Sequence, residues 1–281
     1  MGQAIIDFLP TILALALTGA IAGFGAGMFG IGGGAIIVPA LFYTFKFLGY
    51  DASVITHMAV ATSSAVIIIN AIRSVQSHHK LGNVDWVLLW PQNPFLSYAL
   101  WIGLGSFAAS FLLAPRLSGE ALTMLFAVLA GLMSLQFIFG RPDWTLRSSV
   151  PGGVNRPIVG SLVGSLSALI GIGGGSLTVP LMSMCAVPIH KAIGTASGFG
   201  FVIALPATIG YIISGWSVPL RAPLSLGYVN GPAFICIILS SLFFIPIGAR
   251  LASRLPQKKL KRVFGIFLLC VTVNMARSIF F

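Results

Sequence analysis

The chain carries the same glycine-rich segment twice, and this repetition constrains its fold more than any other feature. Gly30-Ile31-Gly32-Gly33-Gly34 leads through apolar residues to Pro39, and Gly171-Ile172-Gly173-Gly174-Gly175 leads to Pro180. Between residues 19–41 and 160–182, nine of 23 aligned positions are identical. Glycine-rich breaks at matching places in two apolar halves are a strong sequence pointer to a transporter binding site. We therefore expect a duplicated architecture.

The composition indicates a membrane protein. Hydrophobic residues make up 57% of the 281 residues and charged residues 7%, with a mean hydropathy of +1.00. A soluble domain carries about 25% charged residues, so this chain cannot cover itself with polar surface. The net charge of +11 comes mostly from basic residues between apolar stretches, where they set membrane orientation rather than bind nucleic acid. No removable signal peptide is recognisable at the N-terminus.

Each half contains five apolar stretches, and a spanning helix needs about 20 residues. The last three of each half are long enough, at 54–72, 95–113, 121–139, 192–213, 231–252 and 263–281. The first half begins with 8–28, and the stretches beside the glycine clusters at 34–45, 157–170 and 175–187 are shorter. Short pieces that meet at glycines indicate half-helices joined inside the membrane, a break tolerated only within protein or beside a watery cavity.

The basic residues favour one topology. If each glycine-broken pair made a single crossing, the two sides would receive 7 and 9 basic residues. If each pair formed a hairpin, the halves would be inverted and the split would be 12 against 4, which the positive-inside rule favours. The twelve are Arg73, Lys80, Arg141, Arg147, Arg156, Lys191, Arg250, Arg254, Lys258, Lys259, Lys261 and Arg262, and the four are Lys46, Arg116, Arg221 and Arg277.

The predicted fold is thus an all-α polytopic membrane protein made of two homologous, inverted repeats. Each repeat is expected to hold one glycine-broken half-helix hairpin and three spanning helices. The first repeat is assigned to residues 1–140, a linker loop to 141–156 and the second repeat to 157–281. Inverted repeats place both termini on the side with fewer basic residues, which is the outside of a plasma membrane.

The glycine clusters are candidate anion-binding sites. A helix that begins at each cluster leaves its first N–H groups unpaired, and its dipole adds positive potential there. Inverted repeats bring two such helix starts together at mid-membrane. The candidate residues are Gly32, Gly33, Gly34, Gly173, Gly174, Gly175 and Ser176. The alternative is that these glycines only allow tight packing.

Two helix dipoles are insufficient to hold an anion. A helix end contributes about 0.3–1 kcal/mol, and up to ~2 kcal/mol when it is partly buried, whereas removing an ion from water costs several kcal/mol. Hydrogen bonds to a charged group contribute roughly 1.5–3 kcal/mol each, so hydroxyls are needed. The third stretch of each half supplies Thr62, Ser64, Thr195 and Ser197 at matching positions. Alternatively, these small polar residues pack helices and bond to their own backbone.

Ionisable residues restrict the chemistry further. His57 and His190 occupy matching positions and are possible proton carriers, or else ordinary interfacial residues. The five carboxylates, Asp7, Asp51, Asp85, Glu120 and Asp143, all lie outside the centres of the apolar stretches. This argues against cation transport, a carboxylate proton relay and a hydrolase. No metal-ligand spacing is present, and the GxGxxG pattern at 25–30 follows a membrane-length helix, so neither a metal nor a cofactor is expected.

Together these motifs resemble the TauE/SafE sulfite exporter family. The resemblance lies in the paired glycine motifs, in Lys191-Ala192-Ile193-Gly194-Thr195-Ala196, and in Leu81-Gly82-Asn83-Val84-Asp85-Trp86. The second half departs from the last motif, with Leu226-Gly227-Tyr228-Val229-Asn230-Gly231. The resemblance implies a duplicated polytopic protein of roughly eight segments that handles sulfur-containing anions or organic sulfonates.

The function expected from these observations is secondary transport of a small sulfur oxyanion or sulfonate. Export is the simpler direction, because an inside-negative potential favours anion exit by about 2.3 kcal/mol per charge per 100 mV. We therefore expect a non-enzymatic carrier whose partners are a small anionic substrate and the lipid bilayer. Two alternatives stay open. One is an anion channel, and the other is an integral membrane sulfur-transfer protein that uses Cys185.

Overall fold

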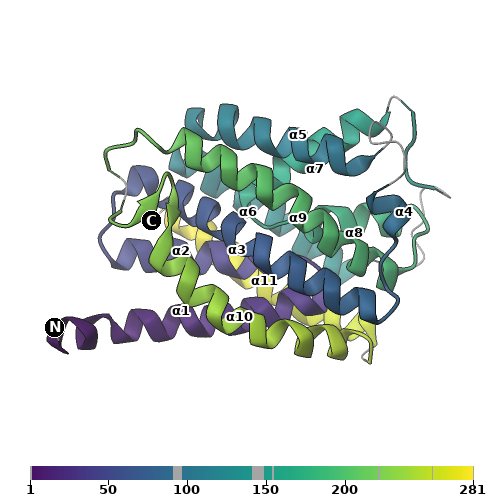
Figure 1. The fold of residues 1–281 in the computed structure, drawn as a ribbon, viewed down its shortest axis with the longest axis horizontal. Coiled ribbons are helices and arrows are strands. Elements are labelled where there is room, and N and C mark those ends of the chain that lie inside the picture. The colour runs from purple at the N-terminus through teal and green to yellow at the C-terminus, as the bar shows by residue number, and fades with distance from the viewer. Residues whose placement is uncertain are drawn as a thin grey trace.

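The computed structural model describes residues 2–90, 97–140, 149–153, 155–220, 222–254 and 256–280 as a helical bundle (Figure 1). The first half contains α1 (Gly2–Phe29), α2 (Gly34–Phe47), α3 (Ala52–Lys80), α4 (Trp86–Leu89), α5 (Tyr98–Ala108, extended by a π turn and a 3₁₀ turn to Arg116) and α6 (Gly119–Phe139). The second half contains α7 (Asn155–Ile170), α8 (Gly175–Met184), α9 (Ile189–Ser214), the two-stranded hairpin β1 (Ser225–Leu226) and β2 (Val229–Asn230), α10 (Gly231–Ala252) and α11 (Gln257–Phe280).

The prediction of an all-α polytopic membrane protein is confirmed. Six helical segments in the described chain are long and apolar enough to cross a bilayer: Leu9–Phe29, Ala52–Lys80, Tyr98–Arg116, Gly119–Phe139, Ile189–Ser214 and Gly231–Ala252. Five of them coincide with predicted spans. The predicted span at 263–281 lies largely in α11, where the described residues contain the shorter apolar segment Leu268–Arg277. The predicted linker at 141–156 falls largely on residues outside the described ranges.

Each glycine cluster joins two helices into a hairpin. α1 runs from one end of the bundle toward its interior, and α2 returns to that end (Figure 1). α7 and α8 make the matching hairpin from the opposite end (Figure 1). α2, α7 and α8 have 14, 16 and 10 residues, so they are as short as predicted. α1 differs, because its 28 residues form one continuous helix rather than a half-helix.

The two hairpins pack against the opposite halves of the chain. α1 lies along α10, and α7 lies along α5. Glycines make both contacts possible: a Cβ on Gly23 would lie 2.4 Å from the carbonyl oxygen of Ser241, and a Cβ on Gly164 would lie 2.0 Å from that of Ile102. Lipid supplies no hydrophobic drive for helix association, so close backbone approach is the main source of attraction. Gly19 and Gly160 approach the same neighbouring helices closely, so Gly19, Gly23, Gly160 and Gly164 all serve helix contacts.

Polar caps mark where several helices start. Asp51 accepts a hydrogen bond from the backbone N–H of Ser53 at the start of α3, and Ser118 accepts one from Ala121 at the start of α6. Asn230 caps α10 through the N–H of Ala233. These caps satisfy N–H groups that the helix itself leaves unpaired. The hydroxyl and the backbone N–H of Ser53 also lower the pKa of Asp51.

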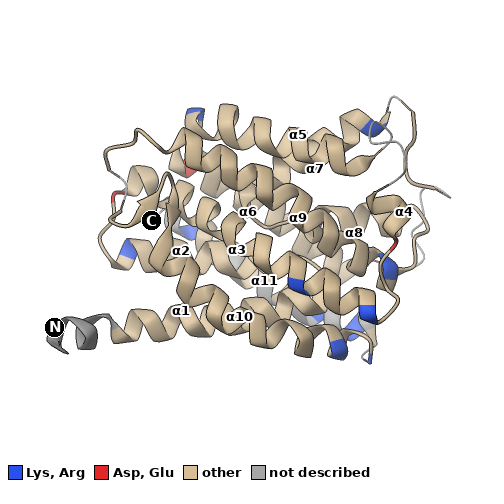
Figure 2. Cartoon of the chain, viewed as in Figure 1, with Lys and Arg blue, Asp and Glu red and all other residues tan. Residues whose placement is uncertain are grey.

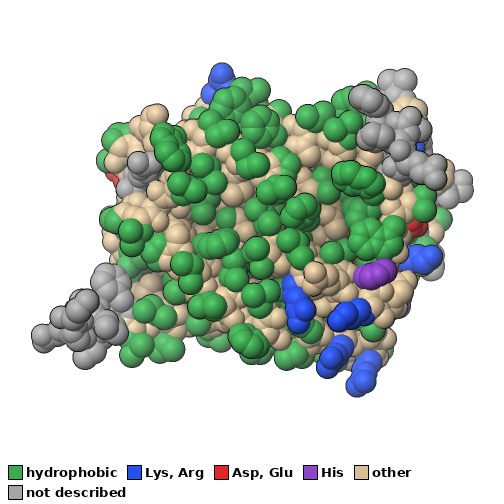
Figure 3. All heavy atoms as spheres, viewed as in Figure 1, with side chains coloured by type: hydrophobic (Ala, Val, Ile, Leu, Met, Phe, Trp, Pro, Cys, Tyr) green, Lys and Arg blue, Asp and Glu red, His purple; other side chains and the backbone are tan. Residues whose placement is uncertain are grey.

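The flank of the bundle is apolar. Figure 3 shows hydrophobic side chains across the broad face of the molecule. Exposed examples from three helices include Leu13, Leu132 and Phe243. Large apolar side chains at this density on a helical flank are suited to lipid contact rather than to water.

We predict that Gly164→Ala destabilises the protein by about 1–3 kcal/mol, because the added methyl group meets the backbone of α5 and overpacks the contact. Thermal unfolding of the detergent-solubilised protein measures the effect. Gly103→Ala is the matched control, since its nearest neighbour would lie at an ordinary 3.6 Å. Equal stability of the two variants would show that α5 and α7 do not depend on this close approach.

Candidate functional site

Each hairpin reverses direction through backbone that only glycine adopts readily. Gly30, Gly32 and Gly33 have φ angles of +68°, +69° and +84°. In the second turn Gly171 and Gly173 have φ angles of +63° and +84°. Side chains disfavour this left-handed region, so the glycines are required by the shape of the turn.

The two turns touch each other through main-chain atoms. A Cβ on Gly34 would lie 2.1 Å from the carbonyl oxygen of Gly171, and a Cβ on Gly175 would lie 2.3 Å from that of Gly30. These two contacts are equivalent under the sequence repeat, because Gly34 matches Gly175 and Gly30 matches Gly171. Helix starts from both halves therefore meet inside the bundle, as the repeat predicts.

Unpaired N–H groups concentrate at this meeting point. The backbone N–H groups of Gly30 and Gly171 donate to carbonyls of the preceding helices at 3.0 Å. The next backbone N–H groups that donate to a carbonyl are those of Ile36 in the first half and Thr178 in the second. Among the described residues, the N–H groups of 31–35 and 172–176 have no acceptor, although all ten residues are buried. A buried helix start without partners is rare, because each unpaired donor costs free energy.

Two side chains of α3 hold the carbonyl groups of both turns. The Ser63 hydroxyl donates to the carbonyl of Gly171 at 2.9 Å, and the Asn70 amide donates to the carbonyl of Gly32 at 3.2 Å. Ser241 of α10 donates to Oδ1 of Asn70 at 2.7 Å. In a trans peptide the C=O and the next N–H point in opposite directions. α3 therefore directs the N–H groups of Gly33 and Ile172 away from itself.

Ser63, Asn70 and Ser241 were not among the residues predicted from sequence. Asn70 carried a usable signal, since it is an amide in an otherwise apolar run and is fully buried. Polar side chains within spanning helices face the bundle interior and bind partners there. Ser63 has no match in the second half, where Ala196 takes its place, so a search for repeated residues passes over it.

The predicted hydroxyls are buried and already have partners. Thr62 accepts from the N–H of Asn230, and Thr195 accepts from the N–H of Asp85, each at 2.9 Å. Each bond ties a spanning helix of one half to the residue that caps a helix of the other half. Ser64 donates back to Val60 at 2.9 Å, which is the intrahelical bonding considered as the alternative. Ser197 also bonds to its own helix, to Ile193 at 3.2 Å, and its hydroxyl forms a second bond of 2.9 Å with that of Ser74 in α3.

Ser176, the remaining predicted hydroxyl, also has a partner, and the predicted glycines are closely packed. Ser176 donates to the carbonyl of Gly173 at 3.1 Å. A Cβ on Gly33 or Gly174 would lie 2.6 Å from a backbone atom, of Ala22 and Gly200 respectively. A Cβ on Gly32 would meet Ile67 at 2.7 Å, and one on Gly173 would meet Ile31 at 2.8 Å. Close packing is thus one role of both clusters, and ligand contact remains a prediction.

The two candidate proton carriers have different surroundings. His57 is buried and stacks on Tyr228, with 5.1 Å between the ring centroids. Its Nε2 donates a hydrogen bond to the carbonyl of Ala114. Its Nδ1 has no partner in the described chain. His190 is exposed at the start of α9. The sequence match between the two histidines therefore does not extend to a shared environment.

Buried His78 was not predicted to have a role. Its Nε2 lies 2.8 Å from the carbonyl of Gly27. The matching residue of the second half is Tyr211, which donates to the carbonyl of Ala168 at 3.2 Å. Each side chain bonds to the end of the helix that leads into a glycine turn.

Other reactive groups of the described chain lie away from the turns. Asp51 and Asp85 cap helices, and Glu120 sits in the first turn of α6. Cys185, Cys236 and Cys270 are not joined by disulfide bonds in the described chain. The described residues contain no group of three or more His, Cys, Asp or Glu side chains that could hold a metal ion.

The basic residues are unevenly divided between the ends of the bundle. Figure 2 shows most Lys and Arg at the end where α3 and α10 finish and α9 and α11 begin. Lys46, Arg116 and Arg277 belong to helices that finish at the other end. Arg141, Arg147 and Arg221, which entered the predicted count, lie outside the described residues.

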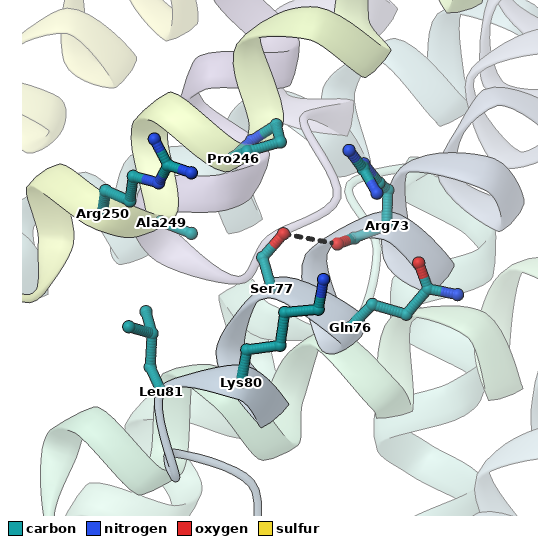
Figure 4. Close-up of a pocket in the computed structure, with 8 residues that line it drawn as sticks. All are labelled: Arg73, Gln76, Ser77, Lys80, Leu81, Pro246, Ala249 and Arg250. Carbon is teal, nitrogen blue, oxygen red and sulfur yellow. Dashed lines mark hydrogen bonds between the residues drawn. The ribbon is translucent and has the colours of Figure 1, made fainter.

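A pocket of about 220 Å³ opens at the basic end, between α3 and α10 (Figure 4). It is lined by Arg73, Gln76, Ser77, Lys80, Leu81, Pro246, Ala249 and Arg250. None of these residues was predicted to bind a ligand. The pocket is separate from the glycine turns, whose residues are buried.

This architecture of apolar spans, with two broken-helix hairpins meeting inside the bundle, is that of a polytopic membrane transporter. The family model described as "Sulfite exporter TauE/SafE" matches residues 15–275. The chain therefore belongs to the TauE/SafE sulfite exporter family.

Relatives along nearly the whole chain are named as transporters. A "Probable membrane transporter protein" of Haemophilus influenzae is 36% identical, covering 94% of this chain and 97% of the relative. One of Methanocaldococcus jannaschii is 26% identical with the same coverage, and YunE of Bacillus subtilis is 24% identical, covering 93% and 96%. No solved structure matches the chain significantly.

We predict that Asn70→Ala destabilises the protein by about 1–3 kcal/mol, because it leaves the Gly32 carbonyl and the Ser241 hydroxyl without a buried partner. Thermal unfolding in detergent provides the measurement. Ser110→Ala is the control, since that buried hydroxyl bonds only carbonyls of its own helical segment. Stability of Asn70→Ala equal to that of the control would contradict a holding role for Asn70.

Proposed function

We propose that the protein is a secondary transporter that exports a small sulfur-containing oxyanion or organic sulfonate across the plasma membrane. The reciprocal contact of the two glycine turns, with their buried and unpaired N–H groups, carries this proposal. Backbone donors at two helix starts suit an anion and offer a cation nothing. The name of the family, sulfite exporter, supports a sulfur oxyanion as substrate.

The proposed site combines the two turns with the hydroxyls beside them. Its residues are Gly32, Gly33, Gly34, Thr62, Ser64, Gly173, Gly174, Gly175, Ser176, Thr195 and Ser197. Two helix ends contribute up to ~2 kcal/mol each, so the several donors of this set are required to offset the loss of hydration. His57 is the better-buried of the two proposed proton carriers, His57 and His190.

Transport by this site requires the turns to separate. With Gly34 against Gly171 and Gly175 against Gly30, no side chain fits between them, and an anion needs more room than a methyl group. Movement of one hairpin relative to the other would expose the N–H groups to one side at a time. This is alternating access around a fixed site, as in transporters built from repeats.

The repeats are proposed to be inverted, with both termini outside. Two observations support this: the glycine hairpins enter from opposite ends, and basic residues gather at one end (Figures 1 and 2). The positive-inside rule assigns that end to the cytoplasm. A tag fused to either terminus is expected to be accessible from outside intact cells. Protection of the N-terminal tag in intact cells, with labelling only after lysis, would exclude this orientation.

Two alternatives differ from a carrier in measurable ways. An anion channel would give flux in proteoliposomes that does not saturate and shows no counter-flow. A sulfur-transfer protein would depend on a thiol, and Cys185 is the buried one. Replacing Cys185, Cys236 and Cys270 with Ser leaves transport intact under the proposal and abolishes activity under the sulfur-transfer alternative.

Glycine substitutions cannot test the site cleanly, since valine at Gly33 or Gly174 would collide with backbone. Ser64→Ala is a better probe. Its hydroxyl bonds only its own helix, so the fold should be kept. We predict that Ser64→Ala weakens anion binding roughly tenfold or more, the value of one hydrogen bond to a charged group.

Thermal-shift titration of purified protein with sulfite, sulfate, thiosulfate and short sulfonates measures this binding, because a ligand of the folded form raises apparent stability. Ser134→Ala in α6 is the control, as another buried hydroxyl bonded to its own helix. Unchanged affinity in a folded Ser64→Ala variant would remove Ser64 from the site.

A further inference from the structure

The pocket between α3 and α10 is a cluster of cations without counter-ions. Arg73 and Lys80 come from α3 and Arg250 from α10, and Figure 4 shows their side chains around one opening. In the described chain, none of the three side chains has a hydrogen bond or an ion pair, and no carboxylate lines the pocket. Three uncompensated cations at one place repel each other unless an anion joins them.

The other lining groups suit an oxyanion. Gln76 brings an amide and Ser77 a hydroxyl, although the Ser77 hydroxyl already donates to the backbone carbonyl of Arg73 at 2.8 Å. The guanidinium groups of Arg73 and Arg250 offer paired donors that match two oxygens of a phosphate. The volume of about 220 Å³ is several times the roughly 30 Å³ that a water molecule occupies in the liquid.

The position of the pocket favours a lipid over a solute. Figure 3 shows Lys and Arg side chains on the broad flank of the bundle, at the corner where α3 and α10 end, with hydrophobic side chains beside them. Along α10 an exposed apolar row of Leu239, Phe243 and Ile247 runs at helical spacing to Arg250. On α3 exposed Ile72 is followed by Arg73. Both helices therefore change from apolar to basic at the same end of the bundle.

We propose that this pocket binds the phosphate headgroup of an anionic phospholipid, with the acyl chains along the apolar row of α10. Basic pockets between spanning helices are suited to anionic headgroups because the phosphate lies at the level where the apolar belt ends. A bound lipid would bridge α3, which holds both glycine turns, and α10, which packs along α1. The inference does not depend on which anion the protein transports.

The test compares two triple variants of equal charge. Arg73→Gln with Lys80→Gln and Arg250→Gln removes the pocket cations, and Lys46→Gln with Arg116→Gln and Arg277→Gln removes three exposed cations from the other end. Each protein is incubated with vesicles of phosphatidylglycerol and phosphatidylcholine in equal amounts, extracted, and analysed by native mass spectrometry. Each cation near a headgroup corresponds to roughly a fivefold change in binding.

We expect wild type and the opposite-end variant to retain phosphatidylglycerol in preference to phosphatidylcholine, and the pocket variant to lose this preference by at least tenfold. Equal preference in the two triple variants would overturn the proposal. If the pocket variant does not fold, the single variants Arg250→Gln and Arg250→Lys replace it. Loss of the phosphatidylglycerol preference in Arg250→Gln and its retention in Arg250→Lys would support binding by charge. An equal preference in these two variants would contradict the proposal.

A second arm separates lipid from a free oxyanion. Sodium sulfate or inorganic phosphate is added to the protein in a neutral detergent, and thermal unfolding is recorded. Under the proposal, wild type and the pocket variant respond alike to both salts. A stabilisation by sulfate or phosphate that is present in wild type and absent in the pocket variant, with unchanged phosphatidylglycerol retention, would make the pocket a solute site and overturn the lipid assignment.

Discussion

The rest of the architecture depends on a contact between main chains, in which Gly34 lies against the carbonyl of Gly171 and Gly175 against that of Gly30. No residue with a side chain fits there without displacing backbone. The contact joins the two halves at their glycine-broken hairpins and brings two helix dipoles together with like ends facing. Buried N–H groups gather at that point without internal acceptors. A concentration of donors in an apolar bundle costs stability, and an anionic ligand is the group that would offset this cost.

The halves are equivalent around this contact and unequal outside it. Thr62 and Thr195 each accept a bond from a helix-capping residue of the opposite half. Ser63 and Asn70, however, have apolar counterparts at Ala196 and Ile203. Side chains of α3 therefore reach a carbonyl of each turn. The duplicated protein is therefore asymmetric here: α3 bonds to both turns, whereas α9, its counterpart in the second half, lacks the matching polar side chains.

The bilayer explains why polar groups lie where they do. Many buried hydroxyls, such as those of Ser63 and Ser64, bond to backbone because the membrane offers no water to satisfy them. Charged side chains of the described residues gather at helix ends, and the basic ones mostly at a single end (Figure 2). The pocket formed by Arg73, Lys80 and Arg250 is a local consequence of that charge separation, since no carboxylate is available nearby to neutralise it.

The sequence alone determined the membrane class, the duplication, the places where helices break and the family, because hydropathy and glycine content act locally and repeat along the chain. It also predicted that the two glycine turns meet. It did not predict that Asn70 and Ser63 hold those turns, or that α1 stays continuous to Phe29. It left open whether Ser64 and Ser197 bond to their own helices, as they do. Those features depend on which helices lie side by side, and only the tertiary structure decides that, because a buried polar atom takes whatever partner the packing brings within hydrogen-bond distance.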